Sequence, residues 1–175
     1  MPASKAALPL AKPGSQAMGP EISADEFRAY AGRTLAPSPW VVIEQSRIDH
    51  FADCTDDPQF IHVDPERAKR ESPFGGTIAH GFLCLSLLSA HGPPDFPVVR
   101  GVAFALNYGL DRVRFITPVR TGSRVRILSK FLSVEEKDPG RLLFKQEKIM
   151  EIEGEPKPAY VAEHLGMFIL EGVGA

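Results

Sequence analysis

The sequence lacks the features that mark several large classes of protein. It has only two cysteines, Cys54 and Cys84, whose separation matches neither a disulfide framework nor the ligand spacing of a zinc site. It has no excess charge of one sign, since 20 basic residues stand against 22 acidic ones. Its longest apolar run, residues 82–90, is about half of what a membrane span needs. We therefore expect no nucleic-acid partner and no membrane partner.

The first 20 residues lack aromatic side chains and a continuous apolar segment. Pro9, Lys12 and Pro13 interrupt the apolar residues there, so we expect no signal peptide and a cytoplasmic location. Such a composition cannot bury enough surface to offset the entropy lost on ordering. We predict a flexible N-terminal arm at residues 1–20 and a single domain at residues 21–175, because the chain is too short for two ordinary domains.

The first half of the chain carries helix signals. Ser23 and Glu26 have the spacing of a capping box, and Gly32 is placed to end that helix. A second short helix is predicted at residues 46–54, with the serine at its start as the cap. A third is predicted at residues 64–71, where an aspartate precedes a proline.

The segment His80–Ala90 is apolar on nearly every side, and a short helix of that kind has to be buried by other elements. Between residues 101 and 171 the pattern changes to the alternation of β-strands. The alternating apolar residues are Val102, Phe104 and Leu106, then Val125, Ile127 and Phe131, then Tyr160, Ala162, Phe168 and Leu170. Turn signals separate these runs, which predicts an antiparallel meander. The expected fold class is α+β, with the sheet curled around one buried helix.

Polar residues are densest at residues 51–65, between two predicted helices. Asp57 and His62 lie there on a loop, so a turn is needed to bring them together. If they meet, a carboxylate and an imidazole can hold one water and move its proton near neutral pH. The alternative is that Asp57 belongs to a turn and His62 is a hydrogen-bonded structural histidine.

Two further regions could bind a ligand. Backbone amides at the start of the buried helix attract an anion, and Gly81 would allow close approach, although His80 and Gly81 could equally serve packing alone. Basic residues crowd the strand region and could meet phosphates, or form a solvated edge: these include Arg112, Arg114, Arg120, Arg124, Arg126 and Lys130. The five histidines are scattered, so no metal site is expected.

Three segments, in this order, resemble the MaoC-like dehydratases, the (R)-specific enoyl-CoA hydratase family, and most of all its nodulation-protein-N-like branch. The likeness covers roughly residues 21–170. The matching segments are Asp57-Pro58-Gln59-Phe60-Ile61-His62-Val63-Asp64-Pro65-Glu66-Arg67-Ala68, Ser72-Pro73-Phe74-Gly75-Gly76-Thr77-Ile78-Ala79-His80-Gly81 and Asn107-Tyr108-Gly109-Leu110-Asp111-Arg112-Val113-Arg114-Phe115.

The resemblance implies a hot-dog fold, usually assembled as a homodimer. It implies that Asp57 and His62 are catalytic in the syn hydration of a trans-2-enoyl thioester, or its reversal, and that the Gly81 amide stabilises charge on the thioester oxygen. No cofactor is implied, because coenzyme A or acyl carrier protein is part of the substrate. Ser89 falls where the family lines its acyl pocket, and the basic residues would hold coenzyme A phosphates. The substrate-binding candidates are His80, Ser89, Arg112, Arg114, Arg124 and Arg126.

The sequence departs from the family pattern beside the predicted pair. Asp56 stands where the family usually has glycine, and Gln59-Phe60 stands where it has Asn-Pro, with proline moved to position 58. Two other functions therefore stay open. One is a hot-dog thioesterase, which would not need an Asp–His pair in this arrangement. The other is an acyl-thioester-binding protein without catalysis.

Overall fold

The computed structural model describes residues 19–172. Most of the predicted arm lies outside the described residues, but Gly19 and Pro20 pack against the domain, because their backbones hydrogen bond with Phe96 and Val98. The helices are α1 (Ala24–Arg28), α2 (Gln45–Thr55), α3 (Phe60–Val63), α4 (Pro65–Glu71) and α5 (Gly81–Ala90). The strands are β1 (Glu21–Ile22), β2 (Val41–Val42), β3 (Val98–Val99), β4 (Val102–Phe115), β5 (Arg124–Asp138), β6 (Arg141–Ile152) and β7 (Tyr160–Leu170).

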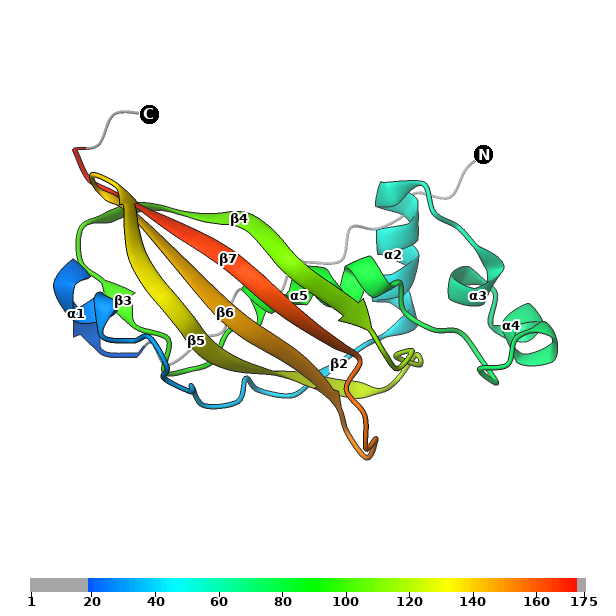
Figure 1. Ribbon diagram of the computed structural model, residues 1–175. Coiled ribbons are helices and arrows are strands. Elements are labelled where there is room, and N and C mark those ends of the chain that lie inside the picture. Colours follow the sequence, from blue (N-terminus) through cyan, green and yellow to red (C-terminus); the bar gives the residue numbers. More distant parts are fainter. Residues whose placement is uncertain (1–18, 173–175) are drawn as a thin grey trace.

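A five-stranded antiparallel sheet in the order β2-β5-β6-β7-β4 curls around α5 (Figure 1). The predicted α+β class is confirmed. The predicted meander holds for β5, β6 and β7, but it is wrong for β4, which pairs with β7 at the far side of the sheet. The reason is the segment after β4, which closes over the start of α5 instead of turning back: Val119 accepts a hydrogen bond from the Ala79 amide at 2.8 Å.

The local helix signals mostly hold. The capping box between Ser23 and Glu26 is present, although α1 ends at Arg28, before Gly32. Asp64 caps α4 through the Arg67 amide at 2.9 Å. The predicted cap at Ser46 is wrong, because α2 begins at Gln45 and places that serine inside its first turn.

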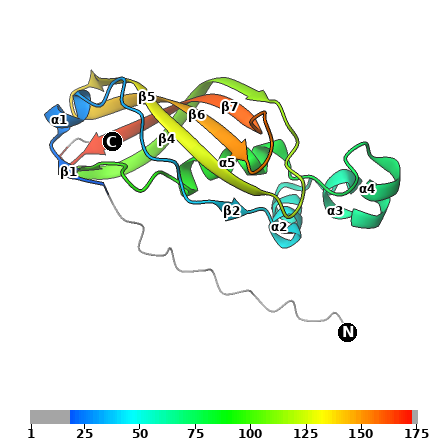
Figure 2. The same cartoon turned by 90° about the horizontal axis from the view of Figure 1, so that it is seen from below.

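Two apolar clusters fill the concave side of the sheet. One surrounds α5, and the other gathers the aromatic rings of Phe27, Phe131, Phe144 and Phe168 beneath α1. α1, β1 and β3 lie at one end of the molecule, while α2, α3 and α4 lie at the other (Figure 1 and Figure 2). In the described part of the chain, no helix has the length and hydropathy to cross a membrane.

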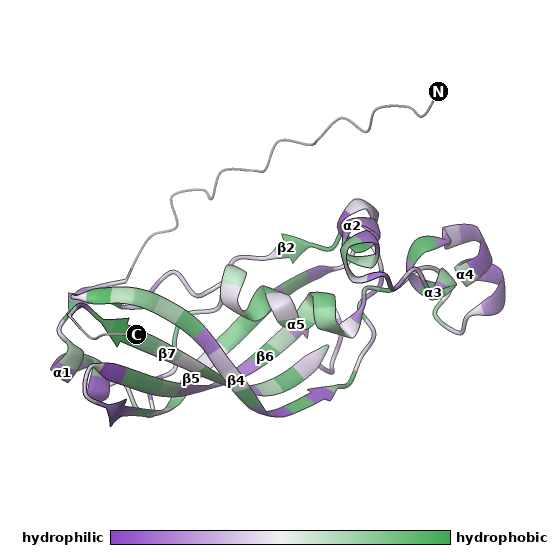
Figure 3. Ribbon diagram, turned by 90° about the horizontal axis from the view of Figure 1, so that it is seen from above, coloured by the Kyte–Doolittle hydropathy of each residue, from purple (hydrophilic) through white to green (hydrophobic). Residues whose placement is uncertain are grey.

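α5 is buried on one side only in the single chain. Leu83, Leu87 and Leu88 are covered by the sheet, but Phe82 is 71% exposed. The alternating Phe104 and Leu106 of β4 are 65% and 51% exposed, so they lie outside the core of the single chain. β4 is an edge strand whose large apolar side chains are exposed within one chain, and Figure 3 shows α5 lying on the open concave face beside it.

Candidate active site

The segment that carries Asp57 and His62 reverses the chain at the end of α2. Asp56 ends that helix in the left-handed conformation, with φ of 55°, and is the only non-glycine of the described residues with positive φ. The Asp57 amide then donates to the Ala52 carbonyl at 3.1 Å. This closure is typical of a helix C-terminus, where glycine usually occupies the left-handed position. It turns the chain toward α3, which carries His62.

Gln45, at the start of α2, fixes α3 and the strand-like segment before α5 in place. Its amide nitrogen donates to the His62 carbonyl at 2.7 Å, and its amide oxygen accepts from Thr77 Oγ1 at 2.5 Å and from Thr121 Oγ1 at 3.1 Å. The Ile78 amide donates to the Ile61 carbonyl at 3.0 Å. Gln45 was not among the predicted site residues, and no motif marks it in the sequence.

The structure brings Asp57, His62 and His80 together. One side-chain ligand atom from each lies within 4.8 Å of those of the other two. The imidazole rings of His62 and His80 stack with centroids 3.7 Å apart, and Asp57 Oδ2 lies 3.9 Å from His80 Nε2. Both histidines are buried, while the Asp57 side chain is 58% exposed. The site thus combines an accessible carboxylate with two shielded imidazoles.

Hydrogen bonds assign the proton on each ring. His62 Nδ1 lies 2.7 Å from the Ile78 carbonyl, which can only accept, so Nδ1 carries the proton and Nε2 has a free lone pair. His80 Nε2 lies 3.0 Å from the Asp57 carbonyl and is the donor by the same reasoning. His80 Nδ1 is buried without a partner among the described residues. His62 is therefore set up as a base, and His80 ties down the backbone of Asp57.

Burial sets the protonation state of His62 near neutral pH. Desolvation is the largest influence and lowers its pKa below the ordinary 6.5. The hydrogen bond to Ile78 and the Asp57 charge act in the opposite direction, while His80 lowers the pKa further. The net result is a neutral imidazole at pH 7, which is the form that can accept a proton.

Gly81 begins α5 beside the histidines. A cavity of about 270 Å³ includes His62, Gly81, Cys84 and Phe115 in its lining. The Gly81 amide belongs to the first turn of α5, where backbone N–H groups have no partner within the helix. A Cβ at Gly81 would lie 3.1 Å from the Phe115 ring, a tight contact that a side chain at position 81 would relieve only by displacing this ring. This position is compatible with both roles considered from the sequence, binding of an anionic oxygen by the Gly81 amide and packing alone.

A metal ion is a second possibility for three such side chains. Binding would need a free lone pair on a nitrogen of each histidine. His80 Nε2 is committed as a donor to the Asp57 carbonyl, and His62 Nδ1 is committed to Ile78. These hydrogen bonds leave a lone pair on His62 Nε2 and on His80 Nδ1, so the group is compatible with proton transfer and with metal binding alike.

The other predicted residues lie elsewhere. Ser89 is near the C-terminal end of α5 and donates to Asn107 Oδ1 at 2.9 Å. Among the arginines, Arg124 pairs with Glu153 at 2.7 Å and Arg126 with Glu151 at 2.6 Å. Arg112 lies farther from its acidic neighbour, at 3.8 Å from Glu163. The Arg114 guanidinium donates to the Val113 carbonyl. Contact of these arginines with substrate stays a prediction.

Comparison with known proteins gives the chain a family. Residues 26–148 match the model of the MaoC like domain. The chain is 50% identical to nodulation protein N of Rhizobium leguminosarum bv. viciae over 142 residues, covering 81% of this chain and 88% of that protein. It is 45% identical to 3-hydroxyacyl-thioester dehydratase Z of Mycobacterium tuberculosis (strain ATCC 25618 / H37Rv) over 147 residues, covering 84% and 96%.

Solved structures agree on the fold. The (R)-hydratase from A. caviae involved in PHA biosynthesis superposes with a TM-score of 0.62 at 20% identity, over 78% of this chain and 94% of that one. The predicted hot-dog architecture is confirmed by this likeness and by the sheet that curls around α5. By its sequence and its fold, the chain belongs to the MaoC-like dehydratase family, in the branch that contains the nodulation N proteins.

Proposed function

We propose that this protein catalyses the (R)-specific hydration of trans-2-enoyl thioesters, or the reverse dehydration of 3-hydroxyacyl thioesters, with Asp57 and His62 as the catalytic pair. The observation that carries the proposal is the neutral His62, whose Nε2 lone pair is free beside the Asp57 carboxylate. Such a pair can hold a water molecule and move its proton near neutral pH.

Family membership supports the general reaction. The MaoC-like dehydratase family makes this protein a hydro-lyase, an enzyme that adds water to a double bond or removes it. The name of the mycobacterial relative adds the substrate class, a 3-hydroxyacyl thioester. Coenzyme A or acyl carrier protein would be part of that substrate, and we propose no further cofactor.

In the proposed hydration, water adds across the Cα=Cβ double bond of the enoyl thioester. His62 Nε2 removes a proton from a water that the Asp57 carboxylate also holds, and the oxygen bonds to Cβ of the enoyl group. The Cα=Cβ electron pair moves toward the thioester carbonyl, whose oxygen gains charge. The Gly81 amide donates to this oxygen, and one such donor is worth about 3 kcal/mol of barrier. The catalytic pair then returns a proton to Cα on the same face.

The open face of the chain supports a homodimer. Phe82 of α5 and five large apolar side chains of β4 are exposed within one chain. Covering such a continuous apolar edge with a second copy would remove it from water. The exposed large apolar side chains of β4 are Phe104, Leu106, Tyr108, Leu110 and Phe115. A single species at the mass of two chains in light scattering is the expected result.

Product analysis tests the reaction against its two alternatives. The purified protein is incubated with trans-2-enoyl-CoA esters of graded chain length, and the products are separated on a chiral column. The (R)-3-hydroxyacyl-CoA is expected. Release of free thiol would indicate a thioesterase. Binding without any product at every chain length would indicate a binding protein.

A further inference from the structure

A row of polar side chains crosses the concave face of the sheet, between the two apolar clusters. On β6 the inward positions are apolar except for Gln146 and Lys148, which are 1% and 3% exposed. His164 of β7 pairs with Gln146 in register, and Ser129 of β5 pairs with Lys148. Asn107 of β4 completes the row by accepting from His164 Nε2 at 3.1 Å.

Three groups in this row lack the partners that buried polar atoms need. The Lys148 ammonium donates to Ser129 Oγ at 3.0 Å, and no ion pair among the described residues includes it. The Gln146 amide nitrogen and His164 Nδ1 have no hydrogen-bond partner within residues 19–172. Burial is costly for an ammonium without an anion and for an amide without an acceptor. Lys148 and Gln146 therefore present donors that a bound oxygen ligand would satisfy, whereas His164, whose Nε2 donates to Asn107, leaves Nδ1 as an acceptor.

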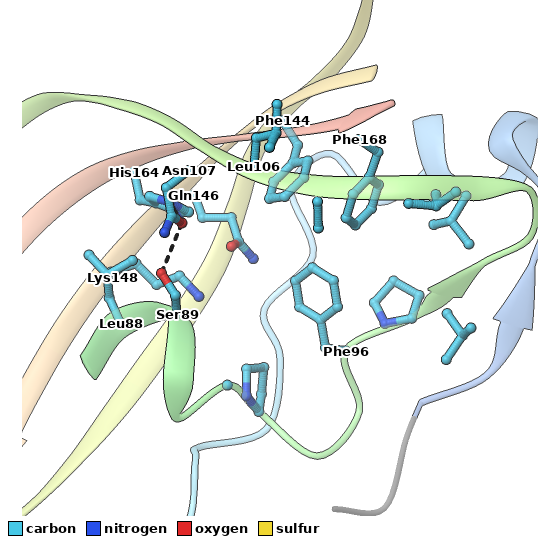
Figure 4. A pocket seen from close by; sticks show the side chains of 17 residues that line it. Leu88, Ser89, Phe96, Leu106, Asn107, Phe144, Gln146, Lys148, His164 and Phe168 are labelled. Carbon is cyan, nitrogen blue, oxygen red and sulfur yellow. Dashed lines mark hydrogen bonds between the residues drawn. The ribbon is translucent and has the colours of Figure 1, made fainter. Parts of the chain in front are cut away.

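Lys148 and Gln146 line a large cavity of about 550 Å³ (Figure 4). Ser89, Asn107 and His164 stand beside Lys148 on one side of it, and the rings of Phe96, Phe144 and Phe168 stand on the other. The Gln146 amide points into the space between them. The cavity thus offers a cationic end and an aromatic end, which suits an anionic group attached to an apolar chain.

A groove joins this cavity to the start of α5. Its lining includes Phe82, next to Gly81, as well as Ser86 and Ser89 further along the same helix. Leu88, Ser89, Asn107 and His164 line both the groove and the large cavity. The eight residue-to-residue steps from Gly81 to Ser89 span about 12 Å along a helix axis. An acyl chain of medium length could reach from the proposed oxyanion site to Lys148.

We propose that the large cavity binds the carboxylate of an aliphatic chain, with the Lys148 ammonium and the Gln146 amide as its donors. A carboxylate has two oxygens and can accept from both groups at once. The carboxylate could be the far terminus of the thioester substrate, which rests on the proposed function, or it could belong to a free fatty acid. Both sources share the chemistry that Lys148 and Gln146 recognise.

Calorimetric titration with octanoate tests the site without any turnover. Octanoate is expected to bind the wild type, and Lys148→Met is expected to weaken binding about 10- to 100-fold, the usual worth of a charge-assisted hydrogen bond. Gln146→Leu, which keeps the ammonium, should weaken it less. Lys145→Met is the matched control, because Lys145 lies on β6 and pairs with Asp111 instead of lining the cavity. Equal octanoate affinity in the wild type and Lys148→Met would overturn the proposal, as would 1-octanol binding equally well.

Turnover separates the two sources of the carboxylate. The ratio of kcat/KM is measured for an enoyl-CoA that ends in a carboxylate and one of equal length that ends in a methyl group. If this ratio is well above one in the wild type and falls to about one in Lys148→Met, the bound carboxylate is the far terminus of the substrate. If octanoate binding depends on Lys148 but the two esters react with equal kcat/KM, the bound carboxylate belongs to a free fatty acid.

If neither ester reacts but octanoate binding still depends on Lys148, the proposed reaction fails and the carboxylate site stands. If both react equally and octanoate does not bind, the site fails and the reaction stands.

Discussion

The imidazole of His80 stacks on that of His62 with ring centroids 3.7 Å apart, and it holds the Asp57 carbonyl at 3.0 Å through Nε2. One buried ring thus contacts both members of the proposed catalytic pair. Its side chain is nearly inaccessible, so it acts through its neighbours and is a positioning residue.

His80→Phe should keep the stacked ring and lose the hydrogen bond to Asp57. We expect kcat to fall about tenfold, since a lost hydrogen bond frees the carboxylate from its position. His80 also lowers the pKa of His62, so the acid limb of the pH profile should move to higher pH. His50→Phe, at an exposed position of α2, serves as the control. An unchanged kcat and pH profile in His80→Phe would contradict a positioning role.

The pH dependence of activity should report His62 itself. Burial lowers the pKa of His62 below 6.5, so the imidazole is neutral at pH 7 and becomes protonated as the pH falls through that lowered value. Protonation removes the base, so hydration should be constant around pH 7 and decline only below pH 6.5. The measurement is kcat/KM from pH 4.5 to 8. A decline that starts above pH 7 would show that a different group limits the rate.

Asp56→Gly should stabilise the chain, because position 56 adopts the left-handed conformation that glycine occupies without strain. We expect the free energy of unfolding to rise by up to about 1 kcal/mol. Urea denaturation measures this change. Asp53→Gly in the body of α2 should instead lower stability by a few tenths of a kcal/mol, since glycine is a poor helix former there. A loss of stability in Asp56→Gly would contradict the account of this turn.

Lys148→Met should raise stability at neutral pH. Burial lowers the pKa of Lys148 from its ordinary 10.5 to about 8. At about 1.4 kcal/mol per pKa unit, the charged side chain costs on the order of 3 kcal/mol at pH 7. Above pH 8 the folded state loses this proton before the unfolded state does, so the wild type gains stability up to pH 10.5. The advantage of the variant should therefore shrink between pH 8 and 10.5.

Thermal unfolding of Lys148→Met at pH 7 and pH 10 measures this difference. His164 is the other titratable group beside Lys148, and its pKa is lowered to about 4, so it stays neutral throughout. Lys145→Met, which breaks a partly exposed pair with Asp111, should change stability by less than about 1 kcal/mol. If Lys148→Met were less stable than the wild type at pH 7, the Lys148 ammonium would have a stabilising partner within the folded protein.

Local signals made much of the fold predictable. The Ser23 capping box, the Asp64 cap and the even spacing along β5 and β7 each depend on residues close in sequence. The place of β4 was not predictable in this way, because its pairing with β7 joins Phe115 to Tyr160 across two intervening strands. Long-range pairing leaves no periodic mark in one sequence.

The site was predictable in its residue types and not in its geometry. The resemblance singled out Asp57 and His62, but the stacking of His62 on His80 depends on contacts that Gln45 makes across three segments. Lys148 did leave a signal, since the alternation along β6 continues through Gln146 and Lys148 with polar residues at inward positions. Such an interruption indicates a buried polar site, although the sequence does not reveal which partners are missing.

The most direct test of the central claim is the loss of enoyl absorbance when trans-2-enoyl-CoA meets the wild type, Asp57→Asn or His62→Ala. The account predicts steady hydration by the wild type and a fall of about 100-fold or more in each variant, the usual contribution of a general acid–base group. Circular dichroism of each variant confirms that the fold is intact. Turnover by Asp57→Asn at the wild-type rate would contradict the account.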